Sequence, residues 1–127
     1  MNNRNVYVLA KALIGLIFLV AGIRKIMYFA ATAGYFAKLG MPMPEIVLSL
    51  TIALEIGGAI LLVIGWQTRL VAMVLGVFTL AAAVLGHPFW AADAANYQNQ
   101  LNHFLKNIAM VGGFLLLAIE SGSQSRK

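Results

Sequence analysis

The sequence predicts an all-α integral membrane protein, an up-down-up-down four-helix bundle with a short interfacial helix between spans one and two. Of its 127 residues, 61% are hydrophobic and only 10% are charged, whereas about 25% are charged in an ordinary soluble domain. Four apolar runs each approach the roughly 20 residues that a spanning helix needs. Little chain remains for anything else, so a single membrane domain over residues 1–127 is expected.

The first span is predicted at about 6–26. Arg4 precedes this run, as in a signal peptide, but the run is too long for a signal h-region. No small-x-small cleavage site follows it at 21–25, and three more apolar segments come later. The segment is therefore expected to stay attached as a membrane span.

Residues 27–43 mix aromatic and basic side chains, which suits a short amphipathic helix at the lipid headgroups. Gly40 and Pro42 are expected to end that helix. The second span is predicted at 44–65, because Pro44 suits the first turn of a helix and Gly65 suits its end.

The third span is predicted at 68–86 and the fourth at 101–119. A polar stretch begins at Asp93, which is a plausible N-cap for the following helix. The residues from Glu120 onward form a short polar tail that is expected to be disordered.

The formal charge of +5 comes from nine dispersed basic residues, so anionic lipid is the expected counter-charge and nucleic acid is not a partner. The distribution of loop charges favours cytoplasmic placement of both termini. The chain has no cysteine, which excludes thiol catalysis, disulfides and thiolate-bound metal within it.

Glu55 lies near the middle of the second span, where a charge costs roughly 2.5–3.5 kcal/mol on insertion scales. Such a side chain is expected to face the bundle interior. It either pairs structurally with Lys25, Lys106 or a hydroxyl such as that of Thr79, or it exchanges protons or binds a ligand. One specific hypothesis joins Glu55, Lys25 and Lys106 in a single buried charge network.

The up-down connectivity brings the end of span one beside the start of span four, together with the end of span three. A polar cavity open at one membrane face is therefore predicted, suited to an amphiphile with an anionic or carbonyl head. Its ligand-binding candidates are Glu55, Lys25, His87, Trp90, His103, Lys106 and Asn107. Snorkelling of the two lysines to headgroups, and capping or interfacial hydrogen bonding by the two histidines, remain open alternatives.

Metal or haem binding is not expected, because the two histidines lie on different segments without the close spacing of a metal site. Arg69 falls in the turn at the opposite face from the predicted cavity mouth. It is expected to anchor the topology and is excluded from the site.

Five signatures follow one another along the chain: GIRK at 22–25, LGMPMP at 39–44, EIGG at 55–58, GWQTR at 65–69 and His87. In order and spacing this series resembles the DoxX family. The segments GHPFW at 86–90 and HFLKN at 103–107 resemble a narrower group of inner-membrane proteins within it.

The resemblance implies a four-helix protein of the bacterial inner membrane. The family's founding members are associated with a thiosulfate:quinone oxidoreductase, and others are linked to redox stress. Lys25, Glu55, Arg69 and His87 occupy its recurring polar positions, whereas His103, Lys106 and Asn107 match only the narrower group. No catalytic role comes with these residues.

Three functions remain open. The favoured one is a redox-associated accessory subunit that binds a quinone-like or other lipophilic molecule and depends on a membrane or peripheral protein partner for electrons. The second is a small-solute or proton-coupled transporter with Glu55 as the coupling group. The third is a non-enzymatic scaffold or stability factor, and homo-oligomerisation through small-residue helix faces is compatible with each. A self-sufficient enzyme is not expected.

Overall fold

The computed structural model describes residues 3–125, and every regular element in that range is helical. The elements are α1 (Asn3–Met27), α2 (Phe29–Lys38), α3 (Pro44–Ile64), α4 (Thr68–Gly86), the 3₁₀ turn η1 (Phe89–Ala91) and α5 (Ala94–Ser125). Four of the helices, α1, α3, α4 and α5, are long and apolar enough to cross a membrane. The predicted fold class, with a short helix between spans one and two, is confirmed.

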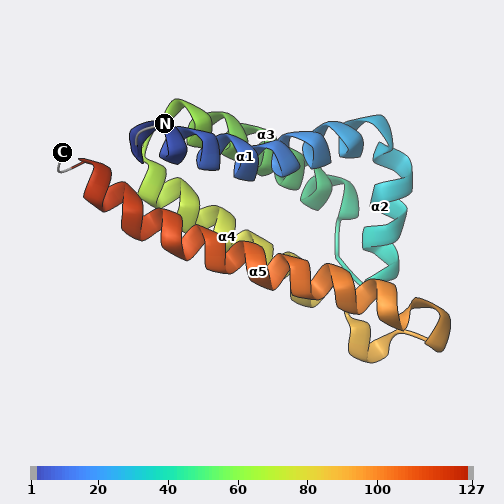
Figure 1. The fold of residues 1–127 in the computed structure, drawn as a ribbon. Helices are drawn as coiled ribbons and strands as arrows, with labels where there is room; N and C mark the ends of the chain where they lie inside the picture. The colour runs from blue at the N-terminus through green and yellow to red at the C-terminus, as the bar shows by residue number, and fades with distance from the viewer. Residues whose placement is uncertain (1–2, 126–127) are drawn as a thin grey trace.

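The four spans form two antiparallel pairs, α1 with α3 and α4 with α5 (Figure 1). The two pairs approach each other at the end that holds the chain termini and the α3–α4 turn. They diverge toward the other end, where α2 and η1 lie (Figure 1). The fold is therefore closed at one end and spread apart at the other.

The apolar core lies where all four spans meet. Phe18 of α1 and Phe114 of α5 bring their ring centroids to 5.6 Å, and both rings are buried. Leu62 of α3 and Leu75 of α4 are fully buried in the same cluster. Within a bilayer such contacts stabilise by close packing rather than by removal from water. The core holds the two helix pairs together and does not fill the diverging end of the bundle.

The predicted boundaries of the second and third spans hold to within one residue. Pro44 occupies the first turn of α3, where its missing N–H leaves no hydrogen bond unmade. Gly65 ends the helix in the left-handed region at φ 91°, and its N–H donates to the carbonyl of Leu61 at 2.9 Å. A tight turn follows, and α4 begins at Thr68.

The fourth span is longer than predicted at both ends. The N-cap prediction is confirmed, because Asp93 Oδ1 accepts the backbone N–H of Asn96 at 3.0 Å and α5 begins at Ala94. The prediction of a disordered tail from Glu120 is wrong as far as Ser125, which is still helical; residues 126–127 lie outside the described range. A prediction from apolar composition finds only the part of a helix that suits lipid. It misses the polar helical turns beyond that part.

Replacing Asp93 with alanine should loosen the first turn of α5. Loss of an N-cap typically costs about 1 kcal/mol, because the Asn96 N–H loses its side-chain acceptor and keeps only the longer bond to the Asp93 carbonyl at 3.2 Å. Backbone amides near Asn96 should exchange hydrogen faster, as measured by mass spectrometry. Asn99→Ala, an exposed change on the same helix, is the control. Unchanged exchange in Asp93→Ala would show that the cap contributes nothing to the helix start.

Candidate functional site

A cavity of about 650 Å³ lies among all five α-helices. This volume falls within the range of small-molecule binding sites. Most of the lining is apolar, with a limited set of polar side chains. The polar members are Lys25, Thr32, Tyr35, Thr51, Glu55, Thr79, His87, His103 and Asn107.

Glu55 and Lys25 form an ion pair in this cavity. Lys25 Nζ lies 3.0 Å from Glu55 Oε1, and only 4% of Glu55 is exposed. The two helices approach closely here, since a Cβ added to Gly22 of α1 would lie 3.5 Å from the Cβ of Glu55. The sequence expectation that Glu55 faces inward and pairs with Lys25 is confirmed. The pair satisfies the charge of a carboxylate placed within a membrane span.

The ion pair does not meet the hydrogen-bonding needs of the carboxylate. Although Lys25 is near, no donor among the described residues reaches Glu55 Oε1 with the alignment of a hydrogen bond. The Thr79 hydroxyl, a predicted alternative partner, donates instead to the carbonyl of Leu75 at 2.7 Å. A carboxylate oxygen can accept more than one hydrogen bond, so the contact with Lys25 leaves it capacity for a further donor. Glu55 Oε1 is therefore a buried acceptor on the cavity wall that favours a hydrogen-bond donor.

Two histidines stand at the diverging end of the cavity. The rings of His87 and His103 stack with centroids 4.8 Å apart and planes 14° apart. His87 Nδ1 lies 2.8 Å from Gln100 Oε1, and because an amide oxygen only accepts, Nδ1 carries the proton. This bond fixes the ring of His87 between the end of α4 and the first turns of α5.

Helix α2 contributes to the cavity wall. The Tyr35 hydroxyl donates to the carbonyl of Gly86 at 2.6 Å, which ties α2 to the end of α4. Tyr35 and Thr32 both line the cavity. The sequence prediction assigned Tyr35, with the other aromatic residues of 27–43, to the lipid interface only, because the pattern of a short amphipathic helix does not show which way the helix leans.

The remaining predicted site residues separate into two groups. Asn107 lines the cavity, as do His87 and His103. Lys106 and Trp90 are exposed and lie outside the lining. Lys106 forms no ion pair with Glu55, so the prediction that it is the third member of a buried charge network is wrong. One residue on a helix is a rotation of about 100°, which separates Lys106 from the inward face of Asn107.

Trp90 belongs to an aromatic cluster beside the cavity. Its ring packs edge-on against Phe89, with centroids 5.1 Å apart, and against Phe104 at 5.9 Å. Tyr97 packs against Phe89 from α5. The cluster holds η1 on the first turns of α5. Within the described residues, no group of three or more acidic or imidazole side chains is placed to hold a metal ion.

Together, the fold and the site define a four-span helical membrane protein that encloses a mostly apolar cavity with a buried acid–base pair. The DoxX family model matches residues 7–88, and the chain belongs to the DoxX family. The match includes Lys25, Glu55 and His87, whereas His103 and Asn107 lie beyond it.

Two curated relatives come from Escherichia coli strain K12. The inner membrane protein YphA is 38% identical over 111 residues, which cover 87% of this chain and 79% of YphA. The inner membrane protein YqjF is 37% identical over 110 residues, with the same coverage of each chain. No solved structure matches the chain significantly.

Proposed function

We propose that this DoxX-family protein binds a small lipophilic, quinone-like molecule in the cavity, as an accessory subunit of a redox system in the bacterial inner membrane. The observation that carries the proposal is the buried Glu55 acceptor beside Lys25 in a mostly apolar space of about 650 Å³. Both E. coli relatives are inner membrane proteins, which supports the proposed location.

The residues present fit a quinone-like head group. Such a head offers carbonyl oxygens that accept hydrogen bonds when oxidised and hydroxyl groups that donate when reduced. Lys25 supplies a donor and Glu55 Oε1 an unsatisfied acceptor, so the pair suits either form. Phe18 and Phe78 provide aromatic wall for the ring. A bound quinone would supply the electron-carrying chemistry, while this chain binds and orients it.

We further place both termini on the cytoplasmic side. The burial of Lys11 within α1 and the pairing of Lys25 with Glu55 remove both lysines from the loop charges that set orientation. Four basic residues then belong to the segments at the end that holds the termini (Arg4, Arg69, Arg126 and Lys127), against three toward the other end (Arg24, Lys38 and Lys106). This orientation opens the diverging end of the bundle toward the opposite face of the membrane.

Native mass spectrometry combined with an ultraviolet–visible spectrum, on protein extracted in native lipid nanodiscs, tests the binding proposal. Wild type should retain a non-lipid molecule. Lys25→Ala should lower its occupancy about tenfold or more, the order expected for losing a charge-assisted hydrogen bond at a buried site. Lys106→Ala is the matched control, since that lysine is next to cavity-lining Asn107 in sequence but is exposed and lies outside the lining.

Three outcomes would contradict the proposal. An empty wild-type protein carrying a stoichiometric second polypeptide would assign a scaffold function. Proton or solute flux in liposomes that is lost in Glu55→Gln, without any retained molecule, would assign a transporter. Equal loss of the molecule in Lys25→Ala and Lys106→Ala would place its binding site outside the cavity.

A further inference from the structure

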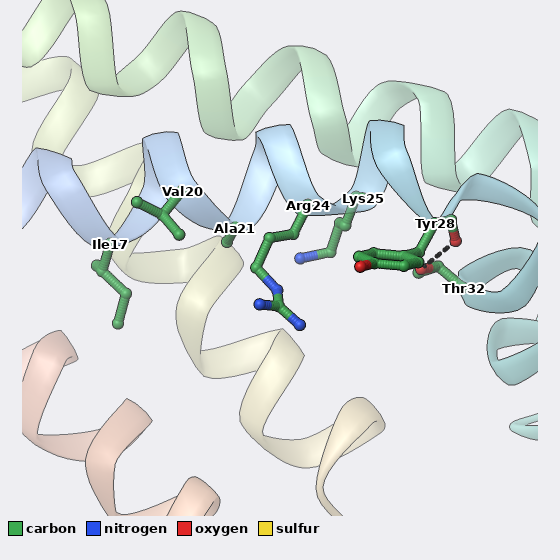
Figure 2. A pocket seen from close by; sticks show the side chains of 7 residues that line it. All are labelled: Ile17, Val20, Ala21, Arg24, Lys25, Tyr28 and Thr32. Atoms are coloured by element: carbon green, nitrogen blue, oxygen red, sulfur yellow. Dashed lines mark hydrogen bonds between the residues drawn. The ribbon is translucent and has the colours of Figure 1, made fainter.

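A second hollow runs along α1, on the side of the helix that faces away from α3. This groove has a volume of about 510 Å³ and is lined by α1 and the start of α2 (Figure 2). Ile17, Val20 and Ala21 make one end apolar, and the other end carries the guanidinium of Arg24 and the ring of Tyr28. The groove is thus amphipathic along the direction of the helix.

The groove opens toward lipid. Helix α1 packs extensively on α3 and α4 packs on α5, whereas contacts of α1 with α5 are sparse among the described residues. Ile17 and Val20 remain 52% and 46% exposed. Val20, Arg24 and Tyr28 line the groove but not the cavity, whereas Ile17, Ala21, Lys25 and Thr32 border both. The two spaces are therefore adjacent and share a wall, and Val20, Arg24 and Tyr28 are the residues that belong to the groove.

Arg24 gives the groove an uncompensated positive charge. Among residues 3–125 the one ion pair joins Lys25 to Glu55, and no carboxylate lies within ion-pair distance of Arg24. Its guanidinium lies 5.7 Å from the centroid of the Tyr28 ring, and Figure 2 shows the side chain extending away from α3 into the groove. Arg24 is in the last turn of α1, where the chain turns into the short interfacial helix.

The spacing between the basic and the apolar end of the groove matches that between the phosphate of a phospholipid and the start of its acyl chains. Arg24 lies seven residues beyond Ile17 on the same helix, and at 1.5 Å per residue the basic end is about 10 Å from the apolar end. A phosphate at Arg24 would place the start of an acyl chain beside Val20 and Ile17. Arginine pairs with phosphate oxygens through its fork of N–H donors, which lysine does not reproduce.

We propose that the α1 groove binds an anionic phospholipid of the bilayer, with the lipid phosphate on Arg24 and one acyl chain along Ile17 and Val20. This site goes beyond the cavity and its ligand. The free positive charge selects a lipid with net negative charge over a zwitterionic one, because the latter brings its own cation to Arg24.

Native mass spectrometry of the purified protein in detergent tests this proposal. Phosphatidylglycerol and phosphatidylcholine with identical acyl chains are titrated separately, and the apparent Kd of the first adduct is measured. Wild type should prefer phosphatidylglycerol. Arg24→Gln should weaken that adduct about tenfold, as expected for loss of one charge-assisted contact, whereas Lys38→Gln should leave it unchanged. Lys38 is an exposed cation on neighbouring α2 and lines neither hollow.

Val20→Trp provides a second variant that keeps the charge and fills the apolar end of the groove. It should weaken the phosphatidylglycerol adduct, while any molecule retained in the cavity stays bound in both Val20→Trp and Arg24→Gln. Equal weakening by Arg24→Gln and Lys38→Gln would overturn the proposal in favour of diffuse attraction. Equal affinity of wild type for the two lipids would also overturn it, and neither result would bear on the cavity ligand.

Discussion

Glu55→Lys should strongly destabilise the protein. The substitution would bury a second ammonium beside Lys25, at a position where the native side chain is only 4% exposed. Breaking a buried ion pair so that a charge is left uncompensated costs about 3–5 kcal/mol, and placing two like charges together adds to that cost. The mutant should melt well below wild type in detergent, or fail to elute as a single species.

Two further variants separate the effect of charge repulsion on stability from the effect of a changed side-chain shape. Glu55→Gln keeps the side-chain volume and removes the charge, so its loss of stability should be smaller. The exchanged pair, Lys25→Glu with Glu55→Lys, restores opposite charges and should recover part of the stability lost in Glu55→Lys alone. If Glu55→Lys melts like wild type, the carboxylate is not buried against Lys25.

The membrane spans were predictable because the bilayer imposes strict requirements on sequence. A spanning helix must be apolar over a fixed length, and Pro44 and Gly65 mark the ends of α3 by their backbone chemistry. A carboxylate within such a span must find a compensating group, which limited the partners of Glu55 to a few residues. Lys25 was among them, and the structure places it at 3.0 Å.

The composition of the cavity was less predictable because it depends on helix rotation and tilt. Lys106 and Asn107 are neighbours in sequence, yet only Asn107 lines the cavity. The bond from Tyr35 to Gly86 joins residues 51 positions apart, and no local pattern encodes it. The apolar stripes of each span locate a packing face but do not show how far two helix pairs diverge.

The closed end of the bundle determines where that divergence begins. Gly58 of α3 lies against Leu75 of α4, and close approach at this point brings the α1–α3 pair onto the α4–α5 pair. Glu55 lies three residues earlier, about one helical turn toward the cavity. Separation of the helices at Gly58 would therefore also disturb the position of the carboxylate.

Gly58→Ala should destabilise the fold, whereas the same change at the adjacent Gly57 should not. A Cβ at Gly58 would lie 2.8 Å from Leu75 Cδ2, so the fully buried Leu75 side chain would have to shift within the core. Overpacking of this kind costs about 1–3 kcal/mol.

Gly57 has nothing within 4 Å of its added Cβ, so Gly57→Ala removes only the helix penalty of glycine, worth up to about 1 kcal/mol in the stabilising direction. The free energies of unfolding of both variants can be compared in mixed detergent. In the double mutant Gly58→Ala/Leu75→Val, the smaller valine relieves the clash with the new Cβ. Its loss of unfolding free energy should therefore be smaller than the sum of the losses in the two single mutants. Additive losses would mean that the clash between α3 and α4 is absent, and that another contact keeps the two helix pairs together beside Glu55.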